Sequence, residues 1–438
     1  MQINGKPANA AIKELKALSS EDASDLHVYK EWQAEAKALE ETSNLSHPHM
    51  IQVKAIITRG RRHYFMFQWA DGGSLRDFYR QTPRPSLEPE FVKEIVHQFI
   101  GLSDALNALH NWEEGSYRHG DLKPENILRF EDGTRVGILK IADMGLAKHH
   151  VAATVARGPT TSRSGTPSYE PPEVYTKSKE ARSRLYDIWS MGCITLELLV
   201  WLLYGYDALL QFHSGLKTTM GTPSPYWWLE KRGTRYFPVL HPNVKACIAH
   251  ISKDPECTRP TAIRDLLSIV ETKLLVISLP RDSRTFWGSG FDDTTSSSSG
   301  EQAPPGIPTI QLTEHESNTN LIVPEVKPNT FRTKADGLCR ALGTIAGKGE
   351  ESENYWSTGA SREGLTGPPT LPIVADGFLS TSDAALPVAQ IDRAKEAFPD
   401  RTKGRQQPGE QSQQGLHAPS PKSDVGDAVA IRPFDHPK

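Results

Sequence analysis

One short string of residues combines the side-chain types that phosphoryl transfer requires. Residues 119–126 read His-Gly-Asp-Leu-Lys-Pro-Glu-Asn. Phosphoryl transfer needs a carboxylate beside the attacking hydroxyl and an amide oxygen on a metal ion, both held on one rigid loop. Asp121 and Asn126 have the spacing for these tasks, and Lys123 can neutralise charge on the transferred group. Taken alone, the string is also compatible with a helix cap or a turn.

A second carboxylate comes directly after an expected strand. Residues 138–142 form an apolar run, and Asp143-Met144-Gly145 are the next three residues. A carboxylate at the end of a strand suits Mg²⁺, which prefers oxygen ligands together with nucleotide phosphates. Asp-x-Gly alone is also ordinary turn chemistry. The assignment of Asn126 and Asp143 as metal ligands therefore depends on segments later in the chain.

Three further sequence motifs follow these residues along the chain. Residues 165–173 read Gly-Thr-Pro-Ser-Tyr-Glu-Pro-Pro-Glu, residues 187–192 read Asp-Ile-Trp-Ser-Met-Gly, and Arg259-Pro260 comes later. Together with the two motifs above, these segments resemble the eukaryotic-type Ser/Thr protein kinase domain over residues 10–280. The phrases HGDLKPENIL and IADMGLAK are most similar to divergent kinase domains of filamentous fungi. The resemblance implies transfer of the ATP γ-phosphoryl group, with Mg²⁺, to Ser/Thr hydroxyls of protein substrates.

The resemblance also implies roles for the residues that contact the substrate and the metal. Asp121 would orient the protein hydroxyl and accept its proton, while Asn126 and Asp143 would hold Mg²⁺. The Lys-Pro-Glu pattern after Asp121 is typical of serine/threonine specificity. Thr166 would contact Asp121 and Lys123 and favour a hydroxyl substrate.

Nucleotide binding is implied for a second group of residues. Lys13 matches the strand lysine that reaches the α/β-phosphates, and Glu35 matches the helix-borne carboxylate that holds its ammonium group. The backbone of Gln68 and Ala70 would bond the adenine at the hinge between two lobes. Phe67 would close the pocket behind the base.

Some matching residues are implied to support the fold. Asp187 would brace the backbone of the catalytic loop. Glu173 would form a buried pair with Arg259 inside the larger lobe, where loss of one partner would leave an uncompensated charge.

The start of the sequence departs from the family pattern. Only twelve residues precede Lys13, and Gly5 is the single glycine among them. The glycine-rich loop that covers the phosphates in this family is therefore missing from the sequence. We expect either an incomplete product of a longer gene or a degenerate kinase. We favour the first because Asp121, Asn126 and Asp143 all remain along with Lys13.

Other departures leave alternatives open. Gly120 replaces the arginine that is usual in the family, and Met144 replaces phenylalanine. Three extra residues between Glu35 and Pro48 leave Glu31 as a weaker candidate for the partner of the lysine. A catalytically impaired pseudokinase that acts as a scaffold is one alternative function. A small-molecule phosphotransferase is another, since such enzymes often carry His-Gly-Asp.

The elements that must position these residues suggest an α+β, bilobal, protein-kinase-like fold. Residues 91–110 have apolar side chains at helical spacing, and 50–57 and 63–69 have the character of short strands. Strands and one helix precede a mostly helical region, as in a small lobe joined to a larger one. The expected domains are a truncated smaller lobe over residues 1–70 and a larger lobe over residues 71–280.

The composition changes after residue 280. Ser/Thr, Pro/Gly and Gln-rich stretches predict a mostly disordered tail over residues 281–438. Within this tail, apolar residues at helical spacing predict a short amphipathic helix over residues 331–345 that docks on the larger lobe.

The net charge and the cysteine content limit the classes of partner and the cellular compartment that we expect for this protein. The formal net charge of −3 gives no reason to expect nucleic acid or an anionic membrane as partner. The four cysteines lie far apart, so we expect buried or incidental thiols in a reducing compartment. The apolar run at residues 188–204 is interrupted by Glu197 and predicts a buried core helix. No signal segment is evident, so an intracellular protein, cytoplasmic or nuclear, is expected; the oligomeric state is left open.

Overall fold

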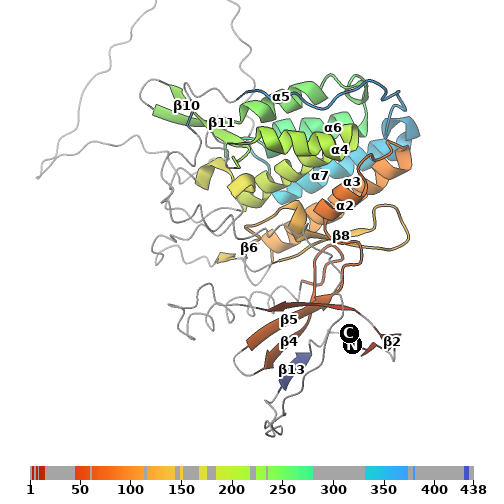
Figure 1. Cartoon of the computed structure of the whole chain (residues 1–438), viewed down its shortest axis with the longest axis vertical. Coiled ribbons are helices and arrows are strands. Elements are labelled where there is room, and N and C mark those ends of the chain that lie inside the picture. Colours follow the sequence, from red (N-terminus) through yellow and green to blue (C-terminus); the bar gives the residue numbers. More distant parts are fainter. Residues whose placement is uncertain are drawn as a thin grey trace, which may run out of the picture.

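The computed structural model shows a small sheet at one end of the molecule and a larger body of helices at the other (Figure 1). It describes residues 2–3, 6–7, 9–14, 45–59, 62–112, 116–143, 148–150, 167–174, 184–217, 223–232, 235–279, 331–372, 378–379 and 429–433. The fold is α+β, with antiparallel strands in the smaller lobe and mainly helices in the larger one, as the sequence predicts.

The sheet of the smaller lobe has the order β13-β4-β5-β3. Its strands are β3 (Ala10–Glu14), β4 (Val53–Arg59), β5 (Arg62–Gln68) and β13 (Val429–Pro433), and all neighbours are antiparallel. The register between β3 and β5 places Lys13 opposite Phe65. Phe65 is fully buried, so this pair anchors the strand that carries the lysine. A separate two-stranded pair joins β1 (Gln2–Ile3) and β2 (Lys6–Pro7).

Helices and short hairpins build the larger lobe. Its helices are α2 (Leu75–Gln81), α3 (Pro89–His110), α4 (Leu185–Gly215), α5 (Pro242–Ile251), α6 (Ala262–Ile269) and α7 (Ala335–Glu351). Single turns lie at η1 (Pro124–Asn126), η3 (Pro167–Tyr169), η4 (Pro172–Val174), η5 (Pro255–Cys257), η6 (Val270–Leu274) and η7 (Glu353–Tyr355). Its strands are β6 (Ser116–Arg118), β7 (Ile127–Phe130), β8 (Ile138–Ile141), β9 (Lys148–His150), β10 (Trp227–Arg232), β11 (Arg235–Leu240) and β12 (Phe378–Leu379).

Helix α3 confirms the helical spacing predicted for residues 91–110. It begins at Pro89, whose fixed φ and missing N–H suit the first turn of a helix. The apolar positions on one face, including Phe99, Leu102 and Leu106, are at most 1% exposed. This face packs against the larger lobe's core and lays the helix beside the strand β8.

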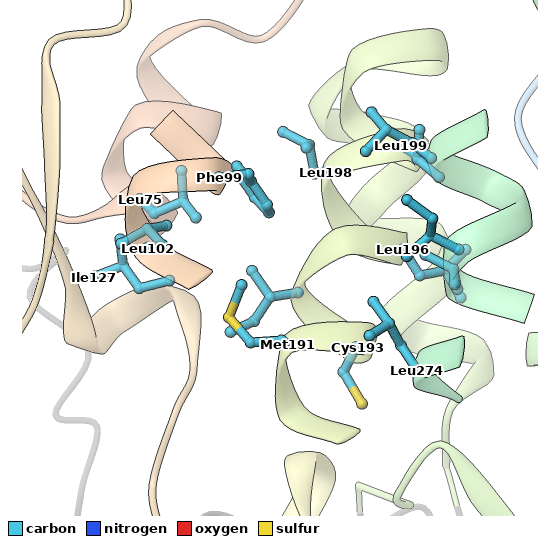
Figure 2. Close-up of a cluster of buried hydrophobic side chains, with 14 of the residues drawn as sticks. Leu75, Phe99, Leu102, Ile127, Met191, Cys193, Leu196, Leu198, Leu199 and Leu274 are labelled. Carbon is cyan, nitrogen blue, oxygen red and sulfur yellow. The ribbon is translucent and has the colours of Figure 1, made fainter. Parts of the chain in front are cut away.

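Helix α4 is the central helix of the lobe, as its continuous apolarity predicts. Figure 2 shows Met191, Leu196 and Leu198 of α4 in a cluster with side chains from several other elements. Within the described residues, α4 is the one helix long and apolar enough to cross a membrane, yet 78% of its most apolar window is buried in the protein. At Gly205 the backbone φ of +84° bends the helix, and a Cβ there would lie 2.6 Å from the Pro83 carbonyl oxygen. Only glycine fits this bend without strain.

Helix α7 is an integral part of the larger lobe. It lies beside α3 and also contacts α6 (Figure 1). Ala335, Leu338, Leu342 and Ile345 are each 2% exposed, so the helical spacing predicted around residues 331–345 is confirmed and continues to Glu351. The packed lobe therefore extends past residue 280, where the composition had placed its end. Composition misplaces this limit because α7 is apolar on one face only.

We predict that Leu342→Ala lowers the free energy of unfolding by about 2–5 kcal/mol, since it opens a cavity between α7 and the core. The matched control is Leu365→Ala, because Leu365 is 39% exposed. This control should cost less than about 1 kcal/mol. Urea unfolding of the full chain measures both, and equal effects for the two variants would contradict the integral role of α7.

Candidate active site

The structure brings the catalytic-loop residues together between β6 and β7. The Lys123 Nζ atom donates to Asp121 Oδ2 at 2.8 Å. The Asn126 side-chain amide donates to the Asp121 carbonyl oxygen at 2.8 Å and to its Oδ2 at 3.1 Å. All three side chains belong to one loop that ends in the turn η1. The Asp121 carboxylate is thus oriented by its two neighbours in the loop.

A buried carboxylate of α4 holds the backbone of this loop. Asp187 accepts from the amides of His119 and Gly120 at 2.9 Å each, and from His110 Nε2 at 2.8 Å. Burial would raise the pKa of Asp187, but the hydrogen bond and charge of His110, together with the charges of His119 and Arg118, outweigh burial and leave the pKa below its usual value. Asp187 therefore stays ionised with no exposure to solvent. The predicted bracing role of Asp187 is confirmed.

Gly120 has a conformational reason to be glycine. Its φ is +82°, in the left-handed region that side chains with a Cβ rarely occupy. Its amide is one of the two that Asp187 holds. Arg118, a nearby basic residue, is buried with its guanidinium 5.1 Å from the centre of the Tyr186 ring.

The strands β7 and β8 place Asn126 beside the residues before Asp143. Their register pairs Ile127 with Ile141, so the residue before β7 lies next to the end of β8. The Ala142 amide donates to the Asn126 carbonyl oxygen at 2.8 Å. Asp143 then adopts a φ of +62°, which turns the chain sharply after the strand. Asn126 and Asp143 thus meet at adjacent strand ends.

This pair suits Mg²⁺ by its donor chemistry. Both side chains offer oxygen atoms, and Mg²⁺ is usually held by one or two carboxylates completed by substrate phosphates. In the described part of the chain, no group of three or more His, Cys, Asp and Glu side chains gathers for a metal. The arrangement therefore fits a metal ion that arrives with a nucleotide better than one held by the protein alone.

Lys13 connects the two lobes at this point. Its Nζ atom lies 2.8 Å from Asp143 Oδ1, and the two side chains are 36% and 47% exposed. A pair this exposed contributes little to the free energy of unfolding. It is informative because it shows where the Lys13 ammonium group lies. It shows that the strand lysine reaches the carboxylate predicted to bind metal. The predicted partner Glu35 lies outside the described residues, as do Glu31, Thr166 and Met144.

The predicted hinge lies at the end of β5. Gln68 is the last residue of the strand and is paired with Ala10 of β3. Phe67 and Ala70 pack against a small buried cluster that contains Ile51, Phe130 and Ala142. This cluster joins the hinge to the strand end before Asp143. The adenine contacts assigned to Gln68 and Ala70 remain a prediction.

The prediction that Glu173 pairs with Arg259 is wrong. Arg259 is exposed, and the partner of Glu173 is Arg332. Arg332 Nη1 and Nη2 donate to the two carboxylate oxygens at 2.6 and 3.1 Å, and Arg332 Nη1 also donates to the Leu185 carbonyl oxygen at 3.1 Å. Its guanidinium lies 4.9 Å from the centre of the Trp189 ring. Arg332 is 1% exposed and the Glu173 side chain is 14% exposed, so this is a bidentate pair between a buried guanidinium and a largely buried carboxylate.

A local signal for Arg332 does exist in the sequence. Both arginines lie three positions before an alanine that begins an amphipathic helix, Ala262 in α6 and Ala335 in α7. Sequence spacing cannot choose between them. Packing does, because α7 lies against α3 and brings Arg332 to the start of α4.

We predict that Arg332→Met lowers the free energy of unfolding by about 3–5 kcal/mol, because it leaves the Glu173 carboxylate without its buried partner. The control Arg259→Met should change it by less than about 0.5 kcal/mol, since Arg259 is exposed. Thermal and urea unfolding of the full chain measure both changes. A loss for Arg259→Met as large as that for Arg332→Met would restore the original assignment.

Comparison with known proteins gives one family. Residues 4–215 match the sequence model described as the protein kinase domain. The chain is 30% identical over 158 residues to the serine/threonine-protein kinase chk-2 of Caenorhabditis elegans, covering 36% of this chain and 30% of that protein. It is 31% identical over 187 residues to the ovarian-specific serine/threonine-protein kinase Lok of Drosophila melanogaster, covering 41% and 36%. The matched stretches span 49% or less of the curated relatives' own lengths.

Proposed function

Residues 4–215 belong to the eukaryotic-type Ser/Thr protein kinase domain family, and from this premise we propose that the chain is a protein serine/threonine kinase. It would transfer the γ-phosphoryl group of ATP to serine or threonine hydroxyls of proteins. Two observations carry the proposal. Asp121, Lys123 and Asn126 bond one another in the loop before β7, and Asp143 follows the end of β8, which lies beside the start of β7.

Each of these residues has a role that its contacts permit. Asp121, oriented by Lys123 and Asn126, accepts the proton of the attacking hydroxyl and positions that oxygen. Lys123 adds positive charge beside the transferred group. Asn126 and Asp143 would hold Mg²⁺, which when bound would neutralise charge on the phosphates. Lys13, which reaches this region from β3, positions the α/β-phosphates.

A second candidate function is favoured by the contact between Lys13 and Asp143. At 2.8 Å, the ammonium group occupies one oxygen that a metal ligand would offer. A chain that retains this pair in the presence of nucleotide would act as a kinase-like binding module. The two functions differ in whether Mg²⁺ and ATP separate the pair.

We predict that Asp143→Ala reduces phosphate transfer to a generic protein substrate more than tenfold, a barrier increase above ~1.4 kcal/mol, because charge neutralisation at the phosphates carries most of this chemistry. The control Asp207→Ala removes an exposed carboxylate of α4 and should leave the rate unchanged. Radiolabel transfer from γ-labelled ATP measures both rates.

Two results would contradict the proposal. Retention of more than about a tenth of the wild-type rate by Asp143→Ala would refute the metal-ligand assignment. A wild-type chain that transfers no phosphate, and that binds ATP in calorimetry with the same affinity whether or not Mg²⁺ is present, would instead support the binding module.

A further inference from the structure

A second buried carboxylate of α4 lies close to the candidate active site. Glu197 has no exposure to solvent, although it lies in the most apolar of the helices that the structure describes. Its Oε1 atom accepts from Tyr169 Oη at 2.7 Å and from Tyr226 Oη at 2.8 Å, and lies 3.0 Å from His213 Nε2. Its Oε2 atom lies 2.9 Å from Arg76 Nη2. Because its partners come from separate segments of the chain, the buried Glu197 carboxylate fixes the positions of these segments relative to α4.

The charge state of Glu197 results from these partners. Burial would raise its pKa, but His213 and Arg76 together outweigh burial and lower the pKa to about 2. The carboxylate is therefore ionised at neutral pH. Burial would lower the pKa of Arg76, but Glu197, Tyr169 and Glu125 together outweigh burial and hold the pKa above its usual value.

Arg76 also reaches the catalytic loop. Its Nε atom donates to Glu125 Oε1 at 2.9 Å, and its Nη2 atom donates to Tyr169 Oη at 2.7 Å. Glu125 lies in η1, between Lys123 and Asn126. One guanidinium thus joins the catalytic loop, the segment that contains Tyr169, and the central helix α4.

The helix that carries Arg76 is itself well fixed. Helix α2 begins with a capping box in which Ser74 and Asp77 bond each other's backbone amides. Ser74 also forms an isolated bridge with Leu128 of β7. The Arg76 guanidinium therefore extends from a helix, α2, whose first turn is fixed by its cap and which is bridged to β7, the strand after the catalytic loop.

We propose that Arg76 is a positioning residue of the candidate active site. By joining Glu125 to Glu197, it sets the position of the turn η1 and so of Asn126 and the Asp121 carboxylate that Asn126 orients. The proposal rests on the proposed kinase function for its effect on rate. Its effect on the structure of the loop does not.

Lysine cannot replace arginine in this role. The guanidinium uses separate nitrogen atoms for Glu125 and Glu197, in a planar fork with a fixed spacing. A lysine ammonium group is a compact point charge on a flexible stem. Arg76→Lys would therefore keep the charge balance of Glu197 and lose the fixed link to Glu125.

The experiment compares Arg76→Lys and Glu125→Gln with the control Arg80→Lys in the full chain. Arg80 lies on the same helix and is 64% exposed, where it pairs with Asp77. Hydrogen exchange of the amides in residues 120–127 reports the position of the loop, whether or not the chain transfers phosphate. Glu125→Gln leaves the charges on Glu197 in place, so it separates the link to the loop from the stability of the core.

We predict at least fivefold faster exchange in residues 120–127 for Arg76→Lys and Glu125→Gln, and wild-type exchange for Arg80→Lys. The turnover number for phosphate transfer should fall about tenfold in both variants with little change in KM for ATP, since misplacement of reacting groups costs rate more than binding. Wild-type exchange in residues 120–127 for Glu125→Gln would overturn the proposal. If exchange rises as expected while the wild-type chain transfers no phosphate, the kinase function fails and the positioning role stands.

Discussion

The candidate active site depends on a carboxylate buried in the core. Asp187 bonds two successive amides of the catalytic loop, and those bonds fix the loop to the first turn of α4. Since the carboxylate is fully buried, it retains its charge only because His110 and the two amides bond it. The orientation of Asp121, the residue after Gly120, depends on this attachment.

The same helix anchors the other parts of the site. Glu197, on α4, receives Arg76 and the Tyr169 hydroxyl. Near its first turn, the Leu185 carbonyl oxygen receives Arg332, which also holds Glu173. A helix that is buried throughout residues 186–203 thus carries the ionic contacts that order the loops around it. One partner in each ion pair, Glu197 or Arg332, is fully buried, and such a charge is costly if its partner is lost because water cannot solvate it.

Much of the site could be predicted from local sequence. The spacing of Asp121, Lys123 and Asn126 within one loop, and of Asp143 after a strand, is set by the chain itself. Asp121, Lys123 and Asn126 bond one another in the structure, and the pairing of β7 with β8 places Asp143 near Asn126. The contact of Lys13 with Asp143 joins residues far apart in the sequence, and the resemblance to a kinase domain placed both near the phosphates. Local patterns predicted these residues because each motif needs only short-range geometry.

The sequence by itself determined the helices α3 and α4, the strands β4, β5 and β8, the spacing of the catalytic-loop residues and the apolar face of α7. Tertiary structure decided which arginine meets Glu173 and which charges neutralise Glu197. Both Arg259 and Arg332 precede an amphipathic helix in the same way, so no local pattern separates them. The choice is made by packing, because only the helix that lies against α3 brings its arginine into the buried space beside Trp189. Partners of buried charges are set by which surfaces pack together, and the chain's own order does not specify that.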